Sequence, residues 1–455
     1  MTNAGSILLI SCYELGHQPL GIAWPRAFLA RAGLAADTLD LAVERWDDAK
    51  IRRATLVAIA VPMHTALRLG VRAARRIRRD NPHCRIAFLG LYAVLNADYL
   101  LDGIADAVFG GEFEEDFVEF AQDIDAGRLP RHTPHATRKQ SFPVPSRDSL
   151  PALTRYTKFR QSGAEVLTGY VEASRGCLHH CLHCPIPPVY NGRFFVVPQD
   201  VVLEDIRRLV APPRGAGHIT FGDPDFLNGP THALRLVRAL HAEFPGVTYD
   251  FTAKITHLLR HRAALDEFAA TGCAFIVSAV ESLSDVVLRH LDKGHTRADV
   301  VDAFALTRAA GIVLRPSLLP FTPWETLDGY LDLLDFADSA DLVDQIDPVQ
   351  LTIRLLIPPG SALLGRAEIQ PFLEELEPRA LGYRWTHPDP RMDALHAEVT
   401  ALVTRATQEG EDPAATIARL HRLAAHRAGR ACSGGMRLPP PERPIPARLT
   451  EPWFC

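Results

Sequence analysis

The sequence predicts an α/β protein in which a doubly wound domain precedes a partial parallel (β/α)6 barrel and a helical C-terminal region. Short aliphatic runs alternate with helix-like segments along residues 6–125, and again in longer units from about residue 165. The 455 residues allow two or three domains. Hydrophobic residues make up 47% and charged residues 23%, a balance that excludes collagen-like, coiled-coil and wholly disordered chains.

Residues 1–126 are expected to form the doubly wound, Rossmann-like domain. The expected strands are 7–10, 39–41, 56–61, 85–91 and 107–109, and the expected helices are 25–30, 65–79 and 114–124. Aliphatic runs bracketed by helices indicate a parallel sheet that is covered on both faces. Ligands of such a domain are expected at the carboxyl ends of its strands. The proline-rich stretch 127–164 is predicted to be a linker.

Residues 165–365 are expected to form a partial, TIM-like barrel, because strands and helices alternate in units of roughly thirty residues. Its expected strands are 166–171, 218–221, 248–253, 274–280, 312–319 and 349–355, and its expected helices are 199–210, 232–243, 258–270, 284–309 and 325–338. Residues 366–430, rich in Ala, Leu, Glu and Arg, are predicted to be helical. Residues 431–455 are predicted to be a proline-rich tail that contains cysteine.

Charge and hydropathy limit the kinds of partner that we expect for this protein. The 49 basic and 54 acidic residues give a net charge of -5, which argues against nucleic acid as a partner. No apolar run reaches the ~18–20 residues of a membrane span, and the N-terminus lacks the basic and apolar segments of a secretory signal. We therefore expect a cytoplasmic protein without a membrane partner. The eight cysteines are too few for a disulfide scaffold in a chain of this length.

Three of the cysteines are crowded together. Cys177, Cys181 and Cys184 lie on one segment directly after the first expected barrel strand. Thiolates are soft ligands that suit iron–sulfur clusters, zinc or copper(I). A cubane cluster has four irons, so three thiolates leave one iron open to a small molecule. The alternative is a zinc site completed by His179, His180 or His183, although structural zinc usually draws on two separated ligand pairs.

The spacing Cys177-x-x-x-Cys181-x-x-Cys184 resembles the motif of the radical S-adenosylmethionine (SAM) superfamily. The layout of residues 6–365 resembles its cobalamin (B12)-binding-domain class. The resemblance implies that these cysteines bind a [4Fe-4S] cluster whose open iron is chelated by the amino and carboxylate groups of SAM. One electron, from a flavodoxin- or ferredoxin-type donor, would then cleave a carbon–sulfur bond of SAM. His183 departs from the family, which often has an aromatic residue there.

The resemblance also implies SAM contacts at the carboxyl ends of the barrel strands. The candidates are Asp223 or Asp225 for the amine, Lys254 for the carboxylate, Glu281 and Ser282 for the ribose, and Arg315 and Ser317 for the SAM carboxylate or a substrate acid. Each has a structural alternative. The aspartates can cap the turn beside Pro224, the lysine can extend to solvent, and Ser282 can cap a helix. No catalytic residue is singled out.

Cobalamin binding is left open by the sequence. The first domain lacks the Asp-x-His-x-x-Gly motif with which some cobalamin proteins supply a histidine ligand. Tyr92, Gly110, Gly111 and Glu112 follow expected strands, where a corrin could be held. The alternative is a domain that only docks against the barrel.

The last residues, Leu-Thr-Glu-Pro-Trp-Phe-Cys, resemble the start of the terminal motif of a cysteine- or selenocysteine-tailed (CUAEP/CCAEP) radical SAM family. In that family a further Cys or selenocysteine and Ala-Glu-Pro follow, so the chain would stop at a selenocysteine codon after Cys455. The alternative is an incidental terminal cysteine.

The favoured interpretation is a radical SAM transferase that methylates or alkylates a small molecule with the help of cobalamin. A second interpretation, suggested by the tailed family, is transfer of the aminocarboxypropyl group of SAM to trivalent arsenic or another soft nucleophile. A third is a non-enzymatic iron–sulfur or zinc-bound protein. The nucleoside product distinguishes them: 5′-deoxyadenosine in the first case, 5′-methylthioadenosine in the second and no SAM cleavage in the third.

Overall fold

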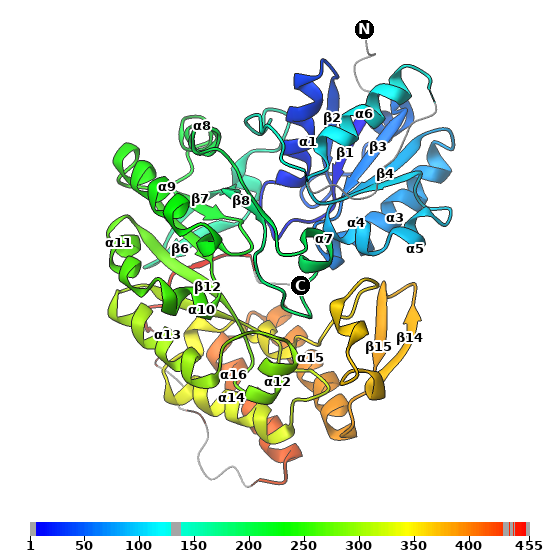
Figure 1. Cartoon of the computed structure of the whole chain (residues 1–455). Coiled ribbons are helices and arrows are strands. Elements are labelled where there is room, and N and C mark those ends of the chain that lie inside the picture. The colour runs from blue at the N-terminus through cyan, green and yellow to red at the C-terminus, as the bar shows by residue number, and fades with distance from the viewer. Residues whose placement is uncertain (1–5, 129–137, 431–435, 437–439, 441, 452–455) are drawn as a thin grey trace.

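The computed structural model describes residues 6–128, 138–430, 436, 440 and 442–451. An N-terminal domain (blue to cyan) lies beside a barrel (green to yellow), and the orange C-terminal region packs below them in Figure 1. Within the described residues, no helix is both long enough and apolar enough to cross a membrane. The α/β fold class with two successive parallel sheets is confirmed.

The N-terminal domain is built on a five-stranded sheet of order β2-β1-β3-β4-β5, in which every pairing is parallel. Its strands are β1 (Ile7–Ser11), β2 (Ala36–Asp40), β3 (Leu56–Ala60), β4 (Arg85–Leu89) and β5 (Ala107–Phe109). Its helices are α1 (Leu20–Arg31), α2 (Asp48–Arg53), α3 (His64–Asp80), α4 (Leu91–Leu95), α5 (Ala97–Leu101) and α6 (Glu114–Asp125). Alternate residues of each strand enter two separate cores, one under α1 and α6 and the other under α3.

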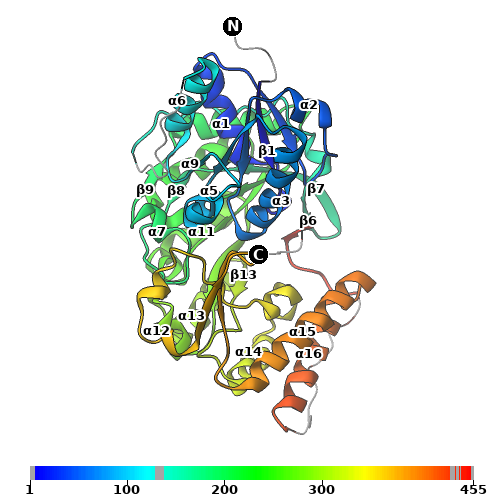
Figure 2. The ribbon, with the colours of Figure 1, turned by 90° about the vertical axis from the view of Figure 1, so that its right-hand side faces the viewer.

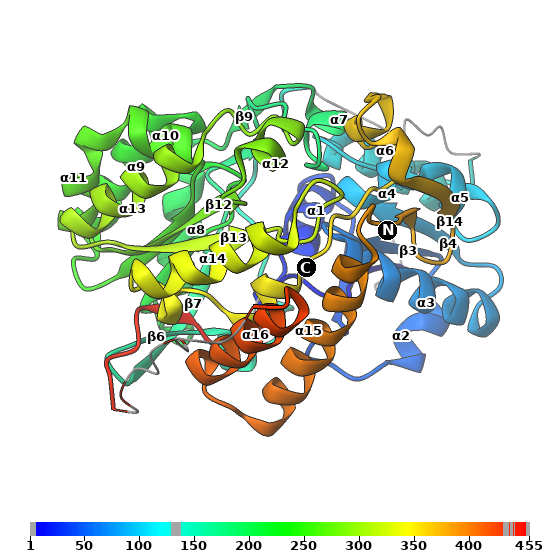
Figure 3. The ribbon, with the colours of Figure 1, turned by 90° about the horizontal axis from the view of Figure 1, so that it is seen from below.

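The barrel is a seven-stranded sheet of order β13-β12-β11-β10-β7-β6-β16. Its parallel strands are β7 (Ala164–Val171), β10 (His218–Phe221), β11 (Thr248–Thr252), β12 (Cys273–Glu281) and β13 (Val313–Leu318). Its helices, seen along one side of the sheet in Figure 3, are α8 (Gln199–Val210), α9 (Pro230–Glu243), α10 (Ile255–Arg260), α11 (Leu265–Ala270), α12 (Asp285–His290), α13 (Arg297–Ala309) and α14 (Leu327–Ser339). Three smaller elements lie on either side of the cysteines in the sequence: β8 (Ser174–Gly176) precedes them, and α7 (Pro187–Tyr190) and β9 (Phe194–Val196), which pairs with β8, follow them.

The sixth barrel strand predicted at 349–355 is wrong. Residues Pro348–Thr352 form a 3-10 helix, and only an isolated parallel bridge joins Phe321 to Arg354. Pro348 stands in the first turn of this 3-10 helix, a position that proline favours because its φ is already helical. The Gln350 side chain instead accepts a hydrogen bond from the Leu318 N–H at 3.0 Å, so a side chain caps β13 where a sixth strand would have paired.

The predicted linker and the predicted helical region also contain strands. Residues Lys158–Gln161 form β6, which turns into β7 through Ser162 and Gly163, both with positive φ. In the tail, β16 (Arg448–Leu449) pairs with β6, and Figure 2 shows the two together. The segment 366–430 begins with an antiparallel hairpin, β14 (Leu373–Glu377) and β15 (Gly382–Trp385), before α15 (Pro390–Glu409) and α16 (Pro413–Arg427). The pairs β6–β7 and β14–β15 are hairpins, in which a short turn joins the two strands. The pair β6–β16 joins distant parts of the chain, and aliphatic content reveals neither kind of pairing.

Candidate functional site

The three cysteines lie on the loop that follows β8, at the carboxyl end of the first parallel barrel strand. Gly176, immediately before Cys177, has φ +76°, and a Cβ there would clash with Arg193 O. Only glycine fits this position, which starts the loop. Cys177 and Cys181 are buried and Cys184 is half-buried, and all three are free thiols. Burial raises the pKa of Cys177, and it raises the pKa of Cys184 to about 12.

Buried cations lie next to these thiols. Lys254 Nζ, at the end of β11, is 3.5 Å from Cys181 Sγ. Lys293 is 2% exposed and exerts a favourable field on the Cys184 thiolate. Three crowded thiols with two lysines beside them match the donor set of an iron–sulfur cluster, because thiolates bind iron and nearby positive charge favours the thiolate form.

Glu281 is held by two partners at the end of β12. Its Oε1 accepts from Lys293 Nζ at 3.0 Å and lies 3.2 Å from His183 Nε2. Burial by itself raises the pKa of this carboxyl, but Lys293 and His183 outweigh it and hold the pKa below its ordinary value. Ser282 donates to Glu325 Oε2 at 2.8 Å. The predicted ribose contacts of Glu281 and Ser282 stay predictions.

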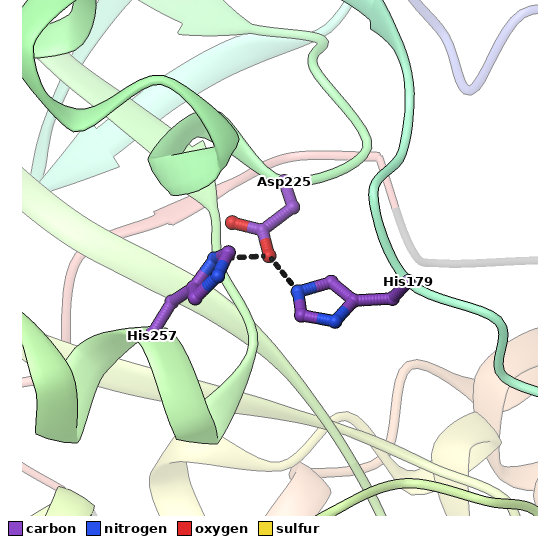
Figure 4. Close-up of side chains that lie close together, drawn as sticks. All are labelled: His179, Asp225 and His257. Atoms are coloured by element: carbon purple, nitrogen blue, oxygen red, sulfur yellow. Dashed lines mark ion pairs between the residues drawn. The ribbon is translucent and has the colours of Figure 1, made fainter. Parts of the chain in front are cut away.

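The two predicted aspartates after β10 differ in their surroundings. Asp223 accepts from Ala173 N and Ser174 Oγ, and burial raises its pKa to about 7. Asp225 instead faces His179 and His257 (Figure 4). Asp223 lines a cavity inside the barrel, whereas the free carboxylate oxygen of Asp225 is directed to the two imidazoles.

That barrel cavity encloses about 820 Å³ of empty space, including its opening. Arg315 on β13 lines it and donates to Asp347 Oδ2 at 2.7 Å, while its Nη1 has no hydrogen-bond partner among the described residues. Glu451 of the tail forms part of the wall, and Ser317 does not. A buried guanidinium with a free donor favours an anionic group in this cavity.

A second cavity, of about 1030 Å³ with its opening, lies between the domains. The ends of β3 and β4 form one wall, and Gly176 and Ile186, which flank the cysteine loop, belong to the other. Of the four predicted cobalamin contacts, Gly111 lines this cavity. Tyr92 packs in the N-terminal core, and a Cβ on Gly110 would meet Val94 at 2.5 Å.

Glu112 contributes to an ion cluster that the sequence did not single out. Its Oε1 accepts from Tyr190 OH at 3.1 Å, and its Oε2 lies 3.8 Å from Arg175 Nη1. Arg175 also bonds Glu114 at 2.6 Å and Glu172 at 3.1 Å. Burial raises the pKa of Glu112 to about 7, against the opposing field of Arg175.

Arg175, two residues before Cys177, could have been found from its place beside the motif. His257 carries no local signal, because only the fold brings it to His179 of the cysteine loop.

Comparison with known proteins shows which protein family the barrel resembles. Residues 171–337 match the model of the radical SAM superfamily, and this match confirms the resemblance predicted from the cysteine spacing. Two curated proteins are similar to it. Hopanoid C-3 methylase of Methylococcus capsulatus is 23% identical over 341 residues, which cover 70% of this chain and 64% of that protein. An uncharacterized methyltransferase of Pyrococcus horikoshii, PH0819, is 25% identical over 238 residues, or 49% of this chain and 50% of that protein. The chain thus spans less than two thirds of either relative.

Solved structures share the two-domain fold. The radical SAM methyltransferase TsrM from Kitasatospora setae, with tryptophan and a SAM analogue bound, has a TM-score of 0.65 at 18% identity, covering 87% of this chain and 88% of its own. The cobalamin-dependent SAM radical enzyme OxsB, with aqua-cobalamin and SAM bound, has a TM-score of 0.67 at 15% identity, covering 93% of this chain and 71% of its own. At these identities the likeness concerns the fold.

Proposed function

We propose that this chain is a radical SAM enzyme that uses a [4Fe-4S] cluster, SAM and cobalamin to methylate a small molecule. Cys177, Cys181 and Cys184 would hold the cluster, and residues 1–126 would form the cobalamin-binding domain. The two curated relatives are named as a methylase and a methyltransferase, and the similar structures contain cobalamin, SAM or a SAM analogue.

The observation that carries this proposal is the position of the interdomain cavity. It opens at the carboxyl ends of β3 and β4, where doubly wound domains bind ligands. The same cavity touches Gly176 and Ile186, the residues on either side of the cysteine loop. A corrin held in the N-terminal domain and a cluster held by the barrel would therefore face one shared space. This arrangement suits methyl transfer, because both cofactors can reach one substrate.

Charged groups around the cysteines would position SAM. Lys254 and Lys293 supply positive charge beside the thiols, and Glu281 supplies a carboxylate. Asp223, Ser282, Arg315 and Ser317 remain further candidates. When bound and reduced, the cluster supplies the electron that cleaves a carbon–sulfur bond of SAM. We expect that electron to come from a flavodoxin- or ferredoxin-type protein.

Anaerobic reconstitution of the full chain tests the proposal. We expect about four irons and four sulfides per chain, a corrin spectrum after incubation with cobalamin, and 5′-deoxyadenosine from SAM and dithionite. Formation of 5′-methylthioadenosine in its place would indicate aminocarboxypropyl transfer. Zinc without iron, or an intact cluster with no SAM cleavage, would contradict the enzymatic proposal.

A further inference from the structure

Three side chains that no step above uses meet beside the cysteine loop (Figure 4). His179 belongs to that loop, Asp225 follows β10, and His257 lies on α10. Asp225 Oδ2 is 2.8 Å from His257 Nδ1 and 3.5 Å from His179 Nε2. All three atoms lie within 4.8 Å of one another. Segments far apart in the sequence thus bring two imidazoles and one carboxylate to a common point.

These atoms are buried without adequate partners. Asp225 is 1% exposed and His257 is 4% exposed. Among the described residues, none of the three atoms makes a hydrogen bond of acceptable geometry, although two of them lie 2.8 Å apart. The other carboxylate oxygen of Asp225 accepts from Leu227 N at 3.1 Å. A buried polar atom without a hydrogen bond lowers the stability of the fold. One bound partner shared by all three atoms would remove this cost.

The donor types that meet at this point fit a cation as that partner. Two histidines and one carboxylate form the donor set of many three-ligand zinc and iron(II) sites.

We propose that His179, Asp225 and His257 bind one divalent metal ion of the zinc type, separate from the cluster. Metal–ligand bonds of about 2.0–2.2 Å place ligand atoms up to ~4 Å apart, a range that includes both measured separations from Asp225. The His179 side chain is 23% exposed, so it has room to move toward His257 and complete the three-ligand set. The ion would fasten the cysteine loop to the end of β10 and to α10, and so fix the loop for cluster binding.

This inference goes beyond the proposed function, because the site uses none of the three thiols and needs no SAM cleavage. The first test is elemental analysis of the full-length chain reconstituted with iron, sulfide and one equivalent of zinc, followed by desalting. We expect one zinc per chain beside the cluster iron. Asp225→Asn, which preserves the size of the side chain, and His257→Ala should each lose the zinc. His83→Ala, which removes an exposed imidazole from the N-terminal domain, should retain it.

The second test removes the cluster. In the full-length triple variant Cys177→Ser, Cys181→Ser, Cys184→Ser, cobalt(II) should bind with one-to-one stoichiometry and give visible absorption bands. We expect Asp225→Asn in this background to weaken cobalt binding by at least about tenfold. Zinc should raise the unfolding temperature of the triple variant but not of its Asp225→Asn derivative. Absence of metal from both the wild-type and the triple-variant chain, or equal affinity with and without Asp225, would overturn the proposal.

Discussion

The carboxyl edges of the two parallel sheets face one cavity but carry opposite chemistry. The ends of β3 and β4 contribute only uncharged residues to it, namely Ala60, Pro62, Met63, Leu89, Gly90 and Leu91. At the barrel edge lie three thiols, two lysines and Glu281, most of them buried, and none of these six lines the cavity itself. Ligands of parallel sheets are expected at strand ends. The difference teaches that the ends of β3 and β4 form a neutral wall, although Glu14 and Glu114 of the same domain also line the cavity, whereas the barrel edge holds the groups suited to chelation and charge.

Replacing any one of the three thiols should abolish cluster binding at the barrel edge. Replacing Cys177, Cys181 or Cys184 with alanine leaves two thiolates, which are too few for the cubane. We expect cluster iron and SAM cleavage to fall to background, as measured by iron and sulfide analysis and by chromatography of nucleosides. Cys84→Ala, which alters a buried thiol in the N-terminal core, should keep both. An active Cys181→Ala protein would refute the chelating role.

The next largest effect should come from Glu281→Gln, which leaves Lys293 buried without its carboxylate partner. Removing one member of a buried ion pair costs about 3 kcal/mol, and denaturant unfolding of the cluster-free chain should show this loss. The pKa of Glu281 is lowered on folding from about 4.5. The stabilisation is thus present above that pH and is lost as the pH falls below it.

The unfolding free energy of the wild type should accordingly drop more steeply than that of Glu281→Gln between about pH 5 and pH 3. Parallel curves for the two proteins would show that the ion pair contributes nothing in solution.

A bulky residue on the neutral wall should affect only the cofactor on that side. Met63→Trp adds an indole beside the cavity at the start of α3. We expect corrin affinity to fall by about tenfold, or ~1.4 kcal/mol, in a spectrophotometric titration. Cluster iron should stay at the wild-type value. Equal loss of cluster and corrin would show that the two edges are not independent.

The smallest effect is expected far from both edges, on the arginine-rich helix α3. Arg76 lies over the Trp46 ring at 4.1 Å and 3.3 Å from Asp80, with its side chain 44% exposed. Exposed pairs of this kind contribute less than about 1 kcal/mol. Arg76→Ala should therefore shift the unfolding midpoint only slightly and leave SAM cleavage with dithionite unchanged. A selective loss with a protein electron donor would make α3 its docking surface.

The last residues, including Cys455, lie outside the described part of the chain, so the tailed-family prediction remains untested. The structure does place the preceding residues. Glu451 lines the barrel cavity, and Tyr13 OH donates to its Oε1 at 3.0 Å. The described part of the tail thus lines this cavity next to β6, in agreement with the expectation that the tail folds over the mouth of the barrel.

The sequence by itself determined the two parallel sheets, the positions of most of their parallel strands and the crowding of three cysteines after the first barrel strand. Strand periodicity, helix amphipathicity and the cysteine spacing are local properties, so they can be read without knowing the fold. The tertiary structure alone decided which distant groups meet. Lys254, Glu281, Lys293 and His257 reach the cysteine loop because successive parallel strands end at the same edge of the sheet. It also decided that Gln350 caps β13 and that β16 joins β6, because such pairings depend on which edge is left free once the sheet has formed.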